Sequence, residues 1–312
     1  MNIKNWIKKL IWRFTPVDYK DKYLRVYLKG GLCNKLHCLF SACDIALKKE
    51  CILIEPFFGW NEKILFSDIY DLDYFNEIMS QYNDGKQIMI SVNKLTAGAI
   101  NRKIINNYRI NLWEYSEKEL EIERFNCNIN KNSTKLKVLK ALKLKPEFEH
   151  LVKEHSNNIF TAIQVRTEPD WIEYAKKKVV GGKETLLINI DKLLKMISNF
   201  HIVGDLFFTS GDNHKEISKA FEKSGIVPFY FYNSNYEYEI NAAINFEICC
   251  NAHFFIGLSR SSYSNLISLK RATMLENDNS FIYNLNDEIL RRIDKGLQSV
   301  ALNSVTKKTI IS

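Results

Sequence analysis

The sequence predicts an α/β fold with two lobes and a cleft between them. Short apolar runs that suit buried strands alternate with segments whose apolar residues recur at helical spacing. Such repeated alternation is typical of a parallel sheet covered by helices on both faces. The chain has 312 residues, of which 46% are apolar, so it is long and apolar enough to build two domains of this kind.

In the first half of the chain, three apolar runs predict strands and two amphipathic runs predict helices. The expected strands cover residues 23–29, 51–56 and 87–92, and the expected helices cover 36–47 and 133–144. The stretch between 93 and 157 is mixed and mostly polar, and we expect a hinge near 145–158.

The second half alternates more clearly. The expected strands cover residues 159–165, 205–210, 227–233 and 253–259, and the expected helices cover 185–200, 213–225, 239–252 and 261–272. We therefore divide the chain into an N-terminal segment of residues 1–20, a first domain over 21–155 and a second domain over 156–312.

Charge and cysteine content narrow the class of protein. The net charge of +8 suits an anionic partner such as a nucleotide, a phospholipid surface or a nucleic acid. Because lysines are spread along the chain, nucleic acid is disfavoured. The seven cysteines lie mostly in apolar runs and lack metal-ligand spacing, which predicts reduced cysteines in the core of a cytoplasmic protein without a metal site.

The N-terminal segment has a basic amphipathic pattern. Apolar residues of "MNIKNWIKKLIWRF" recur at helical spacing, with lysines and an arginine on the other face or its margins. Residues 1–15 therefore suit peripheral contact with the inner face of a membrane, or a helix that packs on its own domain, and both alternatives stay open. No run reaches the roughly 18 apolar residues of a membrane span, and no cleavable signal is evident.

Polar residues follow three predicted strands. They are Gly30 and Gly31 with Asn34, residues 164–171 ("QVRTEPDW"), and residues 257–264 ("GLSRSSYS"). Ligands of a doubly wound sheet bind beyond the carboxyl ends of its strands. These three stretches are therefore the candidate site.

Arg166 is the most informative of these residues, because its planar guanidinium directly follows an apolar strand and suits a phosphate. The alternative is a structural pair with Glu168 or Asp170. Ser261 and Ser262 open a predicted helix, whose first amide groups form an anion site or are simply capped by serine.

Several common motifs are missing from the sequence. It contains no dinucleotide-binding glycine pattern, no phosphate-binding lysine loop and no serine nucleophile elbow. The acidic pair in residues 71–73 lies in an apolar pattern, which predicts a turn and helix start instead of a metal site.

Taken together, these stretches resemble the GDP-fucose O-fucosyltransferase-like glycosyltransferases over roughly residues 24–285. The resemblance rests on the order and spacing of "GGLCNKL", "FSDIYDLDYF", "QVRTEPDW", "FFTSGDN" and "FFIGLSRSSYSNLISLKR". It implies two Rossmann-like domains of the GT-B type, with the acceptor side on 21–155 and the nucleotide sugar on 156–312.

The resemblance also implies roles for individual residues. Arg166 would hold the β-phosphate of GDP-fucose, and Asn34 would face the sugar and phosphate. The implied donor-binding residues are Gly30, Gly31, Gln164, Asp170, Asp212, Ser261, Ser262 and Tyr263. Glu168 lies beside Arg166 and is the candidate general base, unless the leaving phosphate takes the proton.

The sequence departs from the pattern of that family at a few positions. Gln164 stands where the family has histidine, Tyr263 replaces phenylalanine, and Cys33 and Lys35 alter the first loop. These changes leave the donor sugar less defined than the fold.

The predicted function is an inverting, metal-independent fucosyl transfer from GDP-fucose, without a cofactor, to a glycan, lipid-linked glycan or protein hydroxyl. The alternatives are a related enzyme that uses another nucleotide sugar, a binding protein without turnover and a membrane-surface protein.

Overall fold

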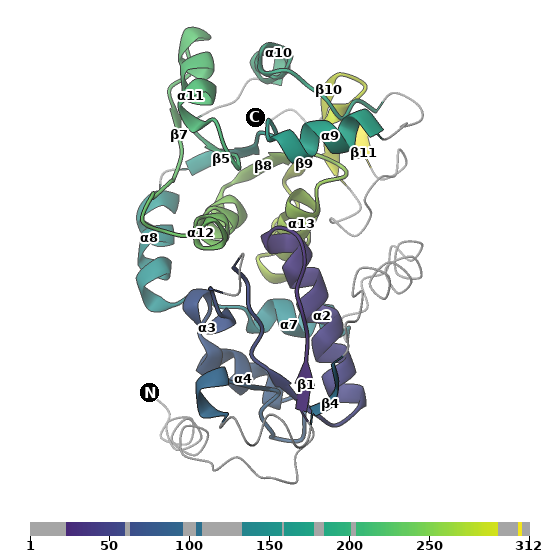
Figure 1. Cartoon of the computed structure of the whole chain (residues 1–312). Coiled ribbons are helices and arrows are strands. Elements are labelled where there is room, and N and C mark those ends of the chain that lie inside the picture. The colour runs from purple at the N-terminus through teal and green to yellow at the C-terminus, as the bar shows by residue number, and fades with distance from the viewer. Residues whose placement is uncertain are drawn as a thin grey trace. The chain divides into compact units, whose positions relative to one another are not determined.

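The structure is a computed structural model that divides into two compact units (Figure 1). Unit 1 comprises Met1–Phe148 with Glu237–Glu239, and unit 2 comprises Glu149–Tyr236 with Ile240–Ser312. The described residues are 23–59, 63–95, 104–107, 133–157, 159–177, 184–200, 204–292 and 305–307, and of 104–107 and 305–307 only the backbone is described. The N-terminal segment lies outside them, so its membrane contact stays a prediction.

Unit 1 is built on a parallel sheet with the strand order β3-β2-β1-β4. Its elements are β1 (Tyr23–Arg25), α2 (Leu32–Lys48), β2 (Ile52–Ile54), α3 (Phe66–Ile69), α4 (Leu72–Ser80), β3 (Met89–Ile90), the 3-10 turn η2 (Val92–Lys94), β4 (Ile104–Asn107) and α7 (Thr134–Ala141). The helix α8 (Pro146–Ser156) crosses the boundary between the units and occupies the stretch where the sequence predicted a hinge.

The helix α2 starts four residues earlier than the sequence predicted. Leu36, Leu39 and Cys43 are fully buried at helical spacing, so one face of α2 belongs to the core. The helix begins at Leu32, directly after Gly31, which places Asn34 on the first helical turn. The acidic pair at 71–73 starts α4 as predicted, because Asp71 accepts a hydrogen bond from the backbone amide of Tyr74.

Unit 2 is built on a seven-stranded sheet with the order β11-β10-β9-β8-β5-β6-β7. Its elements are β5 (Ile159–Gln164), α9 (Pro169–Lys177), α10 (Ile190–Phe200), β6 (Asp205–Thr209), α11 (His214–Lys223), β7 (Pro228–Phe229), α12 (Tyr238–Asn251), β8 (Phe254–Gly257), α13 (Ser262–Met274), β9 (Ser280–Leu285), β10 (Glu288–Arg292) and β11 (Val305–Lys307). The first two residues of α12, Tyr238 and Glu239, belong to unit 1. The strands from β9 to β7 in this order are parallel, whereas β10 and β11 are antiparallel additions.

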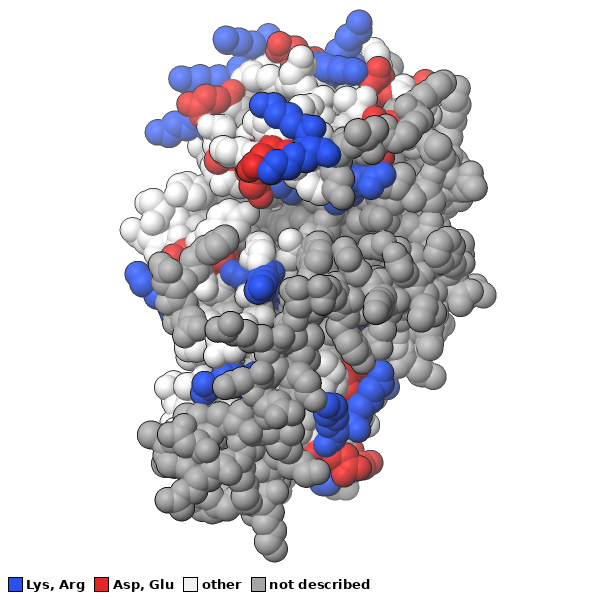
Figure 2. Space-filling model, turned by 45° about the vertical axis from the view of Figure 1, so that its right-hand side comes forward, with Lys and Arg blue, Asp and Glu red and all other residues white. Residues whose placement is uncertain are grey.

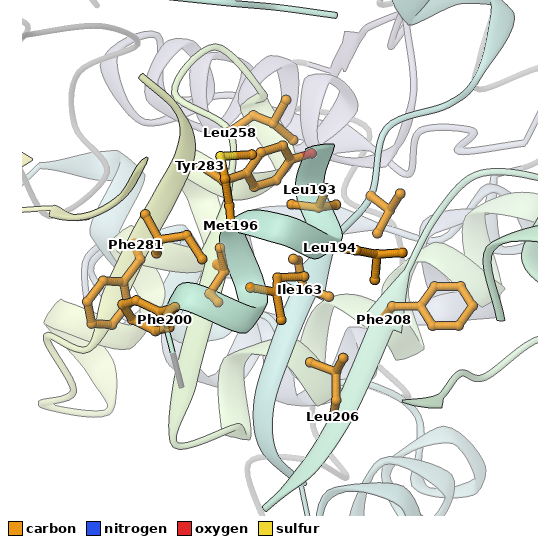
Figure 3. Close-up of a cluster of buried hydrophobic side chains, with 14 of the residues drawn as sticks. Ile163, Leu193, Leu194, Met196, Phe200, Leu206, Phe208, Leu258, Phe281 and Tyr283 are labelled. Atoms are coloured by element: carbon orange, nitrogen blue, oxygen red, sulfur yellow. The ribbon is translucent and has the colours of Figure 1, made fainter. Parts of the chain in front are cut away.

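Helices cover both faces of the sheet of unit 2, as the alternation in the sequence predicted. Figure 1 shows α9 and α10 on one side of the sheet and α12 and α13 on the other. Ile163 and Phe208 pack with Leu193 and Leu194 of α10 in a buried cluster (Figure 3). This core holds the carboxyl edge of the sheet in place.

Two elements of unit 2 differ most in length from the sequence prediction. The helix α10 begins at Ile190, because Asn189 caps it by accepting from the amide of Lys192, while Glu184 pairs with Leu285. The edge strand β7 is limited to two residues, and its Pro228 has no amide to donate to the sheet.

The described cysteines are buried, as the sequence predicted, and none of them is in a disulfide; they are Cys33, Cys38, Cys43, Cys51, Cys249 and Cys250. Within the described ranges, no three histidine, cysteine or acidic side chains come together as a metal site could require. No helix in the same ranges combines the length and apolar character that a membrane span needs.

Candidate active site

Two of the predicted polar stretches emerge at the same edge of unit 2. The strands β5 and β8 are adjacent and parallel, with Ala162 opposite Phe255. The loop after β5 carries Arg166, and the loop after β8 leads into α13. Because both loops leave the carboxyl end of the sheet, they form the edge where ligands of such sheets bind.

Arg166 is held in a fixed orientation. Its Nε donates to Glu168 Oε2 at 2.7 Å, its Nη2 lies 3.7 Å from Asp170 Oδ1, and its guanidinium stands 4.6 Å above the ring of Trp171. The side chain remains 17% exposed, and Nη1 has no hydrogen-bond partner among the described residues. The structural pair with Glu168 that the sequence offered as an alternative therefore exists. It leaves Nη1 of the guanidinium available to a ligand.

Glu168 fills a position that suits holding Arg166. One carboxylate oxygen accepts from Arg166, and the other accepts from the backbone amide of Gly211 at 2.7 Å. A Cβ added at Gly211 would lie 2.7 Å from that second oxygen, so glycine permits the approach. Both oxygens are thus engaged, and the role of general base stays a prediction.

The start of α13 is tied to the end of β5. Ser261 caps the helix by accepting from the amide of Ser264. The hydroxyl of Ser264 donates to Gln164 Oε1 and accepts from the amide of Leu258 at 3.0 Å. This hydrogen bond links the end of β5 to the start of α13, and Gln164 is buried there. The first amides of a helix have no hydrogen-bond partner within the helix itself.

The other predicted donor-binding residues of unit 2 are also engaged. Asp212 accepts from the hydroxyl of Thr167 at 3.1 Å, and Asp170 accepts from the amide of Trp171 at 2.7 Å. The hydroxyl of Tyr263 donates to the carbonyl of Ala242 at 3.1 Å. Ser262 follows the cap residue and is half-buried at the first helical position.

A second arginine at this edge was missed by the sequence analysis. Arg260 donates through Nε to both oxygens of Glu184, at 3.1 and 3.0 Å, and is 29% exposed. Glu184 is 2% exposed and also accepts from Ser259 Oγ at 2.5 Å. An arginine directly before a Ser-Ser helix start was the available signal for Arg260.

Asn284 completes this cluster from the strand β9. Its Oδ1 accepts from the amide of Ser259, and its Nδ2 donates to the hydroxyl of Ser259, both at 2.9 Å. The hairpin of β9 and β10 turns at Asn286 and Asp287, both with positive φ. Two such residues between apolar runs are typical of a two-residue hairpin turn, and this signal was overlooked.

The third predicted stretch lies in unit 1. Gly30 has φ +83, and a Cβ added there would lie 2.8 Å from Asn34 Nδ2. Asn34 Oδ1 is buried without a hydrogen-bond partner among the described residues. The glycine thus lets the backbone approach an amide whose acceptor is unused. The predicted residues are divided between the units, with Gly30, Gly31 and Asn34 in unit 1 and all others in unit 2.

The charge of Arg166 acts on a neighbouring phenol. Burial raises the pKa of the neighbouring Tyr283 phenol, whereas the charge of Arg166 acts in the opposite direction. On the face shown in Figure 2, the described lysines and arginines lie among aspartates and glutamates. The candidate site is therefore distinguished by geometry at the sheet edge and not by a large basic surface on that face.

Comparison with known proteins reveals likeness in fold and a short likeness in sequence. No protein-family model matches the chain. O-fucosyltransferase 23 of Arabidopsis thaliana is 26% identical over 131 residues, a match that spans 36% of this chain and 29% of that protein.

Two solved structures share the fold. POFUT1 in complex with GDP matches 83% of this chain and 97% of its own, with a TM-score of 0.56 and 12% identity. The NodZ alpha-1,6-fucosyltransferase soaked with GDP-fucose matches 86% and 97%, with a TM-score of 0.52 and 13% identity. The predicted resemblance and the α/β fold of the GT-B type are confirmed.

Proposed function

We propose that this chain is a glycosyltransferase that transfers fucose from GDP-fucose to a hydroxyl group of a glycan or protein. The observation that carries the proposal is the pair of arginines at the carboxyl edge of unit 2. Arg166 and Arg260 follow adjacent parallel strands, and a carboxylate orients each of them through Nε. The fold shared with POFUT1 in complex with GDP and with the NodZ fucosyltransferase soaked with GDP-fucose supports the choice of donor.

The proposed role of this edge is to bind the diphosphate. Arg166 offers Nη1, Arg260 offers the end of its guanidinium that Glu184 does not hold, and α13 offers the amides of its first turn. Positive charge that is oriented before the reaction stabilises an anion with little rearrangement. These groups therefore favour the state in which the diphosphate has gained charge.

The proposed reaction is a single displacement at the anomeric carbon. The acceptor oxygen forms a bond to C1 while the bond from C1 to the β-phosphate oxygen breaks. The electron pair of the broken bond stays on the β-phosphate oxygen of GDP. Attack from the opposite face inverts the configuration. The departing phosphate accepts the hydroxyl proton, since both oxygens of Glu168 already accept hydrogen bonds.

In this proposal, Asn34 accepts a hydrogen bond from the sugar. Its Oδ1 is a buried acceptor with no partner in the described structure, and a fucose hydroxyl would supply the missing donor. The two arginines supply the charge that a divalent cation supplies in other transferases, so we propose transfer without a metal.

The test is transfer and hydrolysis with a panel of nucleotide sugars, measured with and without excess EDTA. GDP-fucose should bind and turn over best, and EDTA should leave the rate unchanged. Preference for another nucleotide sugar would reject the donor, and loss of activity that a divalent ion restores would reject metal independence. Binding of GDP-fucose without any turnover would reject the catalytic role.

A further inference from the structure

Unit 1 contains a pocket whose charged residues have no part in the proposed donor site. It has a volume of about 550 Å³ and lies where β1 and β2 end, with Gly30 at its wall. This volume is within the range of small-molecule sites in proteins. All of its lining residues belong to unit 1.

The lining of the pocket carries more positive than negative charge. Arg25, Lys29 and Lys35 are the cations, and Glu55 is the acidic residue. Lys35 is buried and donates to Glu239 Oε1 at 2.6 Å, within unit 1. The charge of Lys35 is thereby neutralised, which leaves Arg25 and Lys29 to set the preference of the pocket.

Glu55 is committed to the backbone. It is 2% exposed, and its two oxygens accept from the amides of Ser67 at 2.7 Å and Val92 at 3.3 Å. These bonds hold the segments after β2 and β3, and each of them engages one oxygen of the carboxylate. The carboxylate therefore acts as a structural clamp and not as a ligand group.

Arg25 and Lys29 have no carboxylate within ion-pair distance among the described residues. Arg25 ends β1, a strand paired on both sides by β2 and β4, so its backbone is fixed. The side chain of Arg25 is half-buried, and Lys29 is exposed. A guanidinium of this kind presents paired donors that fit the two oxygens of a carboxylate, phosphate or sulfate.

We propose that this pocket binds an acidic group on the acceptor, so that the acceptor is an anionic glycan. The assignment of this ligand as the acceptor rests on the proposed function, whereas the binding of an anion by the pocket does not. Gly30 borders both the pocket and Asn34, so an acid bound by Arg25 would sit close to the loop assigned to the reacting sugar.

The test uses glucose and three derivatives that carry an acidic group at C6. Glucose, glucuronate, glucose 6-phosphate and glucose 6-sulfate are titrated into the full chain, and binding is followed by ligand-observed NMR. At least one acidic sugar should bind about tenfold or more tighter than glucose, as expected for charge-assisted hydrogen bonds. The strongest of the three identifies the acid as a carboxylate, phosphate or sulfate.

Three variants locate the effect. Arg25→Gln should abolish the preference for the acidic sugar, and Lys29→Gln should reduce it without affecting folding, because Lys29 is exposed. Lys86→Gln makes the same charge change at an exposed turn away from the pocket and should have no effect. Equal binding of all four sugars, or an equal loss in Lys86→Gln, would overturn the proposal.

A parallel titration with GDP-fucose separates this proposal from the proposed function. Retained GDP-fucose binding with no preference for acidic sugars rejects only the anion-binding role of the pocket. If the protein does not bind GDP-fucose but prefers acidic sugars through Arg25, the result supports anion binding by the pocket and rejects only GDP-fucose as the donor.

Discussion

The two units present their charged residues to ligands in different ways. At the edge of unit 2, Arg166 is paired with Glu168, and Arg260 is paired with Glu184. In the pocket of unit 1, Arg25 and Lys29 have no such carboxylate among the described residues. A paired arginine is oriented before the ligand arrives, whereas an unpaired one is ordered by the ligand itself.

This difference indicates a division of work. Oriented charge suits a step in which a transition state must be stabilised without rearrangement. Unpaired charge suits selection of a ligand, because an uncharged competitor leaves the cation without compensation. Under the two proposals, the edge of unit 2 is therefore the reaction site, and the pocket of unit 1 is the recognition site.

The largest expected effect is at Arg166. Arg166→Ala should lower kcat for fucosyl transfer by about 10²–10³-fold, as removal of a charge-stabilising donor does elsewhere. Arg166→Lys should also be impaired, because an ammonium cannot donate to Glu168 and a phosphate with the same planar geometry. Steady-state kinetics with GDP-fucose measure both.

The control for this prediction is Lys195→Ala, which removes an exposed charge from α10 of the same unit. Thermal melting shows whether each variant folds. An Arg166→Ala variant that melts like the wild type and keeps near-normal kcat would remove this residue from the mechanism. A variant that does not fold would make the pair with Glu168 structural.

Arg271 tests whether pairing with a carboxylate is a general rule in unit 2. This arginine is fully buried, and its guanidinium donates to the carbonyls of Cys250 at 2.9 Å and His253 at 2.8 Å. Burial lowers its pKa to about 10, so it stays charged at neutral pH. Arg271→Met would leave these carbonyls unsatisfied and should lower the free energy of unfolding by about 3 kcal/mol or more.

Urea denaturation measures this effect, with Lys219→Met at an exposed position of α11 as the control. A loss below about 1 kcal/mol would mean that solvent or a rearranged helix end satisfies the carbonyls.

Gly30 tests the recognition side of the comparison. Gly30→Ala puts a side chain at φ +83, which should lower the free energy of unfolding by about 1–2 kcal/mol, and its Cβ would displace Asn34. Gly85→Ala is a matched control, because Gly85 has φ +76 but nothing lies within 4 Å of the added carbon.

Both variants should lose similar stability in urea denaturation, and only Gly30→Ala should lose transfer activity. Equal activity in the two variants would show that Asn34 plays no part in the reaction.

The smallest expected effect is a pH dependence at His214. Burial lowers the pKa of this imidazole, despite a hydrogen bond with the carbonyl of Ser210 and the charges of Asp212 and Glu168. The folded state therefore favours neutral histidine, and its contribution is present above the unfolded pKa of about 6.5 and is lost as the pH falls toward the lower folded value. Thermal melting between pH 7 and pH 5 should show this loss.

His214→Phe keeps an aromatic ring in the stack with Tyr230 and Tyr232 and should reduce the pH dependence. An unchanged pH profile in this variant would assign the loss to other groups of the chain.

Sequence alone determined the features that depend on near neighbours in the chain. Apolar periodicity predicted the α/β alternation, and serine and aspartate predicted the helix starts at Ser261 and Asp71. Arg166 was found because a charged fork directly follows an apolar strand. Each of these signals lies within one or two turns of the residue that it concerns.

Tertiary structure decided which distant residues meet. Glu184 reaches Arg260 across 76 residues, and Ser264 meets Gln164 across 100. Nothing in the sequence connected Arg25 with Lys29, and only the structure shows that both residues line one pocket. Local patterns cannot specify such pairs, because strand order in a sheet depends on the packing of the whole domain, and that order brings distant loops to one edge.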